Sequence, residues 1–334
     1  MFELIKILTE AWGPSGYEHQ VRALIKEEVS DLADEMTVDG MGNLICRVGE
    51  KGQGKKVMIA AHMDEIGVMA TYAEPESHYL RFTNIGGLLY TSMHGNRVKF
   101  EDGTIGVVAA HDAFGKGRSS VSSVNDFYID VQDENGDMTI EAGSPAGFWR
   151  ETQQRGNRII AKALDDRIGC VIAIEAMRKL KANGTANENY FVFTTQEEVG
   201  VRGAKSAAFG VNPDVGIALD VTSTGDEIKG RKMAVKLGGG AAIKVMDTTL
   251  IVPKAIVDWM KESAESNGID YQLELLTGGG TDGSAIQNIH SGVPTGCISI
   301  PTRFLHTTSE TVDLNDVQAC IDLLSGLLEN EIAL

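Results

Sequence analysis

The segment YFVFTTQEEVGVRGAKSAAFGVNPDVGIALD, residues 190–220, contains a complete strand–helix–strand unit. Residues 190–195 form one apolar run and residues 216–220 form another, while residues 203–209 between them have the composition of a helix. Apolar strands that alternate with helices are typical of a parallel sheet covered on both faces. The segment therefore predicts an α/β fold.

The same alternation extends in both directions along the chain. Apolar spacing and breakers predict further helices and strands. The expected helices are 2–12, 17–33, 166–180, 256–266, 284–289 and 316–328, and the expected strands are 44–47, 57–61, 271–276 and 295–299. Together these elements predict an α/β fold with a mixed, largely parallel sheet flanked by helices.

The pattern of predicted secondary structure changes between residues 67 and 160. Short strand-like pieces alternate there with Gly, Asn, Asp and Ser turns, and no long helical pattern interrupts them. The expected strands are 67–72, 79–82, 97–100, 106–110 and 127–131. We therefore predict two domains: residues 1–66 and 161–334 form a catalytic domain, and residues 67–160 form an inserted all-β domain.

Composition excludes several classes of function. The 334-residue chain has a net charge of −17 and no basic block, which argues against nucleic-acid binding. No apolar run reaches the length of a membrane span, so we expect no membrane insertion. The first residues, MFELIKILTEAW, carry charges within an amphipathic pattern and lack the features of a secretion signal. These features predict a cytoplasmic protein.

The four cysteines are Cys46, Cys170, Cys297 and Cys320. They are far apart and have apolar neighbours, and none forms a CxxC pair. This spacing excludes the common zinc-finger and thioredoxin-like motifs. We predict four buried free thiols.

Histidine and acidic residues follow the apolar runs at five separate places. His62 follows VMIAA, Asp165 follows IIAKAL, Glu197 and Glu198 follow YFVFTTQ, Asp220 ends GIAL, and His306 ends ISIPTRFL. Ligands in α/β sheets gather at the carboxyl ends of the strands. We therefore expect these side chains to meet at one edge of the sheet.

Such a cluster is costly unless cations compensate its charge. Crowding two imidazoles and several carboxylates would cost on the order of several kcal/mol in repulsion and desolvation. Two divalent ions would remove that cost, and mixed histidine and carboxylate ligands suit zinc, cobalt or manganese. Asp64, two residues after His62, is placed to support the second ring nitrogen of that histidine.

The remaining histidines and the glycine-rich runs are not predicted to bind metal or nucleotide. The remaining histidines, His19, His78, His94, His111 and His290, lie in polar or turn-like surroundings and are not assigned to metal. The glycine runs 238–240 and 278–280 lack the flanking residues of a nucleotide-binding loop and indicate close backbone approach instead. Thr281 and Asp282, which follow the second run, are candidates for a substrate pocket.

At this point the motifs resemble those of the TET-type aminopeptidases, metallopeptidase family forty-two, a group that includes proteins formerly labelled glucanases. The resemblance covers nearly the whole chain. Its motifs, in order, are LTEAWGPSGYE, AAHMDEIGVM, AKALDDRIG, TTQEEVGVRGA, ALDVTSTGD, LTGGGTDGSA and GVPTGCISIPTRFLHTTSE.

The resemblance implies a specific role for each residue of the site. His62, Asp165 and Asp220 match the ligands of one metal ion, and Asp165, Glu198 and His306 match those of a second, with Asp165 shared. Glu197 matches the general base and Asp64 the residue that supports His62. The resemblance also implies that the inserted domain is a PDZ-like dimerisation domain and that dimers assemble into a hollow dodecamer.

The predicted function is a di-metal-dependent aminopeptidase that releases N-terminal residues from short peptides with a free N-terminus. Metal-assisted hydrolysis would use Glu197 as the general base. One alternative is a metal-independent glycosidase (endoglucanase) with paired carboxylates, although adjacent Glu197 and Glu198 do not face each other across a sugar. Another is a non-catalytic scaffold with the same fold.

Overall fold

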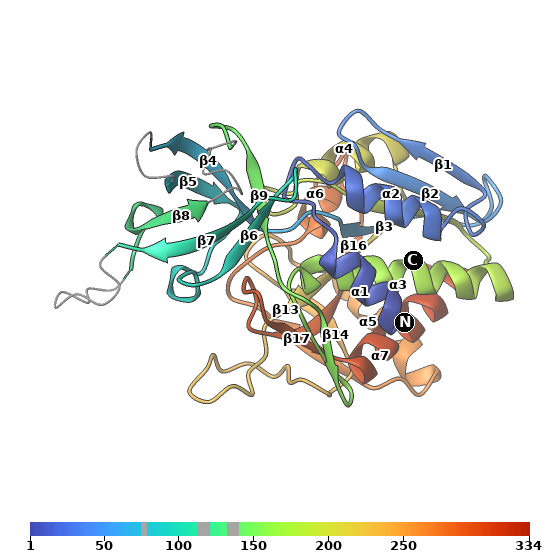
Figure 1. Cartoon of the computed structure of the whole chain (residues 1–334). Helices are drawn as coiled ribbons and strands as arrows, with labels where there is room; N and C mark the ends of the chain where they lie inside the picture. Colours follow the sequence, from blue (N-terminus) through green and yellow to red (C-terminus); the bar gives the residue numbers. More distant parts are fainter. Residues whose placement is uncertain (75–78, 112–120, 132–139) are drawn as a thin grey trace.

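The computed structural model of the chain describes residues 1–74, 79–111, 121–131 and 140–334. Figure 1 shows a sheet-and-helix body from which a smaller group of β-strands projects to one side. The helices are α1 Phe2–Glu10, α2 His19–Glu28, α3 Leu164–Asn183, α4 Arg202–Val211, α5 Lys254–Ser266, α6 Asp282–Gln287 and α7 Leu314–Glu329, with two short 3-10 helices, η1 Tyr90–Ser92 and η2 Val124–Asp126.

Within the described part of the chain, eleven strands form one large sheet. These are β1 Glu35–Val38, β2 Leu44–Val48, β3 Lys56–His62, β10 Gln153–Arg155, β11 Arg158–Ala161, β12 Glu188–Thr194, β13 Val215–Thr222, β14 Ala241–Met246, β15 Tyr271–Leu275, β16 Thr295–Arg303 and β17 Glu310–Asp313. The main path runs β1-β2-β12-β3-β13-β16-β17-β11-β10, and β14 branches from β16 and pairs with β15. The predicted mixed α/β sheet is thus confirmed.

The four central strands of this sheet, β12, β3, β13 and β16, are parallel to one another. Every residue of β13 is buried, as expected for a strand covered on both faces. The strand–helix–strand unit predicted for residues 190–220 corresponds to β12, α4 and β13. Because these strands run in one direction, their carboxyl ends lie along one edge.

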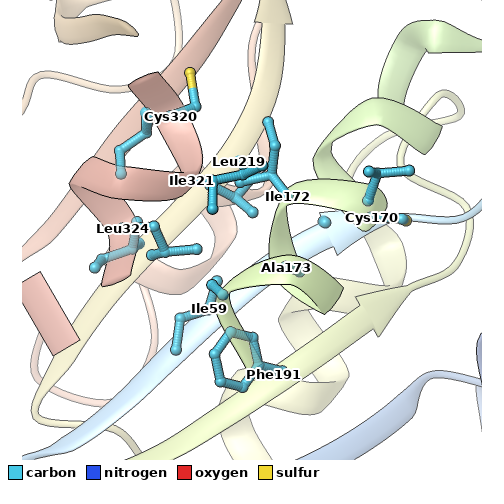
Figure 2. Close-up of a cluster of buried hydrophobic side chains, with 14 of the residues drawn as sticks. Ile59, Cys170, Ile172, Ala173, Phe191, Leu219, Cys320, Ile321 and Leu324 are labelled. Carbon is cyan, nitrogen blue, oxygen red and sulfur yellow. The ribbon is translucent and has the colours of Figure 1, made fainter. Parts of the chain in front are cut away.

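The hydrophobic core lies between the sheet and helices α3 and α7. Figure 2 shows Ile172 of α3 and Ile321 of α7 facing Leu219 of β13 and Ile59 of β3. All four side chains are buried. Burying an aliphatic side chain of this size stabilises the fold by about 1.5–3 kcal/mol. This packing anchors α3, whose first turn carries Asp165 of the predicted site.

The smaller part is a closed β barrel with its own core. Its strands, in barrel order, are β4 Gly67–Ala73, β5 Tyr79–Ile85, β8 Phe127–Val131, β7 Ile105–Ala110, β6 Arg97–Phe100 and β9 Pro145–Phe148. Side chains such as Phe82, Phe100 and Phe127 fill its interior. The barrel strands end at Phe148, whereas β10 and β11 pair in the large sheet, although residues 153–160 belong to the predicted insertion.

Two further sequence predictions concern thiols and membrane spans. All four cysteines are buried and free, as predicted. Among the residues that the structure describes, no helix combines the length and apolar character needed to cross a membrane.

Candidate metal centre and active site

The predicted site residues meet at the carboxyl edge of the central strands. His62 is the last residue of β3, Glu197 and Glu198 follow β12, and Asp220 lies in β13. His306 lies beyond β16, in the connection to β17. This convergence is expected for parallel strands, because their carboxyl ends lie along one edge of the sheet.

Asp165 occupies the first turn of α3 with non-helical backbone angles, φ −77° and ψ 103°. The residue before the helix, Ala163, has a left-handed conformation with φ 53°. The chain therefore turns sharply before the regular helix begins, and the Asp165 carboxylate comes within reach of the strand ends. Asp165 is buried in this position, with a relative exposure of 8%.

The Asp165 carboxylate lies between two imidazoles. Its Oδ1 is 3.0 Å from Nε2 of His62, and its Oδ2 is 3.3 Å from Nε2 of His306. The same nitrogen of His306 is 3.7 Å from Oε2 of Glu198. One ligand atom each from His62, Asp165 and Glu198 lie within 4.8 Å of one another. These separations place four potential metal ligands around a common space.

The unpaired atoms and charges of this cluster fit a divalent cation. Oε1 of Glu198 is buried and has no hydrogen-bond partner among the described residues, an arrangement that a folded protein rarely leaves uncompensated. Burial, with nearby carboxylates, raises the pKa values of Glu197, Glu198 and Asp220 well above the usual range. A cation would stabilise the charged carboxylates, and the mixed nitrogen and oxygen donors suit a borderline metal such as zinc or cobalt.

The two imidazoles respond to the same negative charge. Burial alone would lower the pKa of His306, but the hydrogen bond to Asp165 and the charge of Glu198 raise it to about 10. For His62, hydrogen bonds to Asp165 and Asp64 similarly outweigh burial and raise the pKa. Both imidazoles thus act as partners for surplus negative charge, the role that a metal ion would take over.

Asp64 links His62 to the loop that carries Glu197 and Glu198. Its carboxylate accepts hydrogen bonds from the backbone amides of Glu197, at 3.0 Å, and Glu198, at 3.1 Å. Nδ1 of His62 lies 3.1 Å from the Asp64 carbonyl oxygen and 3.4 Å from its carboxylate. The Asp64 carboxylate also accepts a 2.6 Å hydrogen bond from the Ser15 hydroxyl. Asp64 is therefore positioned to orient His62, chiefly through its carbonyl.

Sequence reasoning missed several residues that hold the site together. The Glu310 carboxylate accepts hydrogen bonds from the backbone amides of Asp165, at 3.0 Å, and His306, at 2.9 Å. The carbonyl oxygen of Gly87, between β5 and β6, lies 2.6 Å from Nδ1 of His306. Glu310 is the last residue of the motif GVPTGCISIPTRFLHTTSE. Its position four residues after His306 is the sequence feature that could have identified it as a supporting residue.

A cavity of about 380 Å³ opens beside the cluster and is lined by Asp165, Glu197, Glu198, Asp220 and His306, among others. Gly280 and Ser284, which flank Thr281 and Asp282, also line it. Thr281 itself caps α6 by accepting from the Gly283 amide, and Asp282 accepts from the Thr194 hydroxyl. The assignment of Thr281 and Asp282 to a substrate pocket stays a prediction.

A larger groove of about 640 Å³ lies along α7 and the end of α5. The described residues that line it include no histidine, so the chemistry distinguishes the smaller cavity as the candidate site. The unassigned histidines have other partners: His19 lies 3.1 Å from Glu101, His111 contacts Arg81, and His290 stacks on Phe209. His78 lies outside the described residues.

Comparison with known proteins gives one consistent result. A family model described as M42 glutamyl aminopeptidase matches residues 42–323. An Acetivibrio thermocellus protein named "Putative aminopeptidase" is 43% identical over 327 residues, 97% of each chain. An aminopeptidase from the archaeon Desulfurococcus kamchatkensis has a similar structure, with a TM-score of 0.92 and 38% identity over 98% of this chain and 94% of that one.

A second solved structure bears on assembly. It is the TET1 peptidase of Pyrococcus horikoshii, which can assemble into a tetrahedron or a large octahedral shell. The TM-score is 0.86 and the identity 33%, over 98% of each chain.

Proposed function

Since this chain belongs to the M42 glutamyl aminopeptidase family, and is an aminopeptidase as the sequence predicted, we propose that it uses two divalent ions to release N-terminal residues from short peptides. The observation that carries the metal assignment is the Asp165 carboxylate, whose two oxygens lie 3.0 and 3.3 Å from separate imidazoles. A carboxylate in that position is suited to bridge two cations.

The proposed ligand sets share Asp165. His62, Asp165 and Asp220 would hold one ion, and Asp165, Glu198 and His306 the other. Zinc and cobalt suit these ligands best, and manganese is a further candidate. When bound, the ions supply Lewis acidity for the scissile carbonyl and lower the pKa of the attacking water.

Glu197 is proposed as the general base. It lines the cavity beside the ligands, and burial raises the pKa of its carboxyl group well above the usual range. A raised pKa makes the carboxylate a better proton acceptor near neutral pH. Glu197 would take a proton from water and deliver it to the amine of the departing peptide. Asp64 would keep Glu197 and Glu198 in place through their backbone amides.

Chelation followed by metal restoration tests this proposal. Prolonged chelation should abolish hydrolysis of aminoacyl-anilides, and cobalt, zinc or manganese should restore it. Acetylation of the substrate amine should greatly reduce cleavage, because an aminopeptidase recognises a free N-terminus. Full activity in metal-stripped protein would overturn the metal assignment. Equal cleavage of blocked and free peptides, or cleavage of cellulose chains, would contradict the substrate class.

The inserted barrel is proposed to mediate self-association. We assign residues 1–66 and 161–334 to the catalytic domain and residues 67–160 to a PDZ-like dimerisation domain, although residues 153–160 pair in the large sheet. Apolar side chains including Tyr72, Ile105 and Val107 are exposed on the barrel surface, which supports an interface there. The tetrahedral shell described for the P. horikoshii relative supports a dodecamer of such dimers. The four free thiols fit a cytoplasmic location.

A further inference from the structure

The cavity beside the proposed metal centre has a distinctive lining. Among its described lining residues, charged side chains are confined to His306, Asp165, Asp220, Glu197 and Glu198. The remainder of the wall includes the aliphatic side chains of Val201, Val221, Leu276 and Leu305. The surface left for a substrate side chain is therefore largely apolar.

The hydroxyls of two threonines of this wall, Thr222 and Thr249, donate hydrogen bonds to carboxylates that lie outside the lining. The Thr222 hydroxyl donates to Oε1 of Glu274 at 2.7 Å, and the Thr249 hydroxyl donates to Oδ1 of Asp247 at 2.9 Å. Because these hydroxyl protons are already committed, neither threonine has a donor left for a substrate carboxylate. The wall is therefore less polar than its composition suggests.

The charged groups behind the wall pair with one another. Nζ of Lys244 lies 2.6 Å from Glu274 and 3.5 Å from Asp247, and all three side chains are fully buried. None of the three belongs to the cavity lining described above. Lys244 therefore presents no free cation to an acidic substrate. The two carboxylates exceed it by one negative charge, but both are fully buried behind the wall and expose no oxygen to a basic substrate.

An exposed cation, Arg231, lies near the cavity. The Arg231 guanidinium is 3.5 Å from the position that a Cβ atom on Gly278 would occupy. Gly278 precedes the lining residue Gly279, and Arg231 itself is solvent-exposed and outside the lining. Exposed charge pairs contribute only about 0–1 kcal/mol, so Arg231 is a weak candidate for selecting an acidic residue.

From this wall we infer that the enzyme prefers a neutral, aliphatic N-terminal residue over a glutamyl or lysyl one. This inference rests on the proposed aminopeptidase function and specifies its substrate class. An aliphatic side chain would bury its surface against Leu276 and its neighbours. An ionised side chain would lose its water without gaining a counter-charge.

The test compares leucyl-, lysyl- and glutamyl-4-nitroanilide on the assembled, metal-loaded enzyme. We expect kcat/KM for the leucyl substrate to exceed the other two by at least about tenfold, in line with the cost of leaving a charge unpaired. A higher kcat/KM for the glutamyl or lysyl substrate would overturn the inference while leaving aminopeptidase activity intact. Failure to hydrolyse any of the three, with metal bound, would instead overturn the proposed function and the inference with it.

Charge-insertion variants give a second measurement. Leu276→Arg places a cation in the cavity wall and should raise the glutamyl-to-leucyl ratio of kcat/KM by about tenfold. Leu275→Arg is the matched control, because Leu275 is the next residue, is 55% exposed and is outside the lining. An equal change in both variants would contradict the assignment of Leu276 to the pocket. If the unmodified enzyme prefers the glutamyl substrate and Arg231→Ala removes that preference, Arg231 is the selecting residue and the inference is wrong. The substrate comparison stands alone if Leu276→Arg fails to fold.

Discussion

The Ser15 hydroxyl donates a 2.6 Å hydrogen bond to the carboxylate of Asp64, 49 positions further along the chain. Ser15 belongs to the Gly13–Gly16 breaker that follows α1, so the first turn of the chain reaches the centre of the site. Nearby, Arg167 donates to the carbonyl oxygens of Leu8 and Gly13, which holds this turn against the start of α3.

We expect Ser15→Ala to weaken catalysis without unfolding the protein. The substitution leaves the Asp64 carboxylate with one donor fewer, and loss of such an outer partner typically reduces activity or metal affinity by about 10- to 100-fold. Steady-state kinetics and metal content measure the effect. Ser30→Ala is the control, since that hydroxyl bonds only to the exposed Glu27 carbonyl. Equal activity in both variants would show that the Ser15 bond is dispensable.

Glu310→Gln should disturb the metal centre. The substituted amide can accept from only one of the two backbone amides, those of Asp165 and His306, that the carboxylate now serves. We expect weaker metal binding and an altered visible absorption spectrum of the cobalt-loaded protein.

A matched control separates this effect from general destabilisation. Asp316 is also buried and accepts from two backbone amides, those of Gly238 and Gly240. Asp316→Asn should lower the melting temperature but leave the cobalt spectrum unchanged. If both variants change the spectrum alike, Glu310 acts through overall stability.

Glu197 and Glu198 should have different functions although they are adjacent. Oε2 of Glu198 lies 3.7 Å from His306, within the ligand cluster. Glu197→Gln should keep both ions bound and reduce turnover by about 10²–10⁴-fold, because only the proton acceptor is lost. Glu198→Gln should weaken one metal site, with activity partly restored at high metal concentration. The opposite pattern of metal loss would reverse the two assignments.

Gly87→Ala tests the contribution of the barrel to the site. A Cβ atom at Gly87 would lie 3.1 Å from Nδ1 and 3.2 Å from Cε1 of His306, so the imidazole must shift. We expect about a tenfold loss of kcat/KM, since small misplacements of catalytic groups are costly. Gly210→Ala on α4 is the control, because its Cβ meets nothing within 4 Å. Unaltered kinetics in Gly87→Ala would show that His306 tolerates the contact.

Self-association through the barrel is measurable by light scattering. We expect a dimer or a larger multiple such as a dodecamer, and we expect Val107→Asp to shift it to smaller species by placing a charge on an apolar interface. Val107 is 42% exposed on β7. Ile7→Asp on α1, where Ile7 is 44% exposed, is the control in the α/β body. A fully active monomer at all dilutions would contradict the proposal.

The sequence predicted those parts of the structure that leave a local pattern. Continuous apolar runs predicted β12 and β13, and the residues just beyond such runs included the site residues. β14 was missed because the charged Lys244 interrupts its apolar run, and only the structure shows that Glu274 compensates it. β17 was missed because it has only four residues and begins and ends with a carboxylate.

The residues that support the site, such as Ser15 and Gly87, were not predicted for a different reason. Ser15 and Gly87 act through contacts 49 and 219 residues distant in sequence. Such contacts depend on how the chain folds back and produce no periodic signal. A local segment can therefore predict which residue types follow a strand, but not which distant serine or carbonyl will hold them.

The hydrogen bond between Gly87 and His306 also has a consequence during protein synthesis. Its two partners are separated by 219 positions. A growing chain cannot close this contact until most of the sequence has left the ribosome and the barrel has joined the body. Contacts of such long range also form slowly. The Gly87 carbonyl can therefore orient His306 only after the barrel and the segment beyond β16 have both been synthesised and folded together.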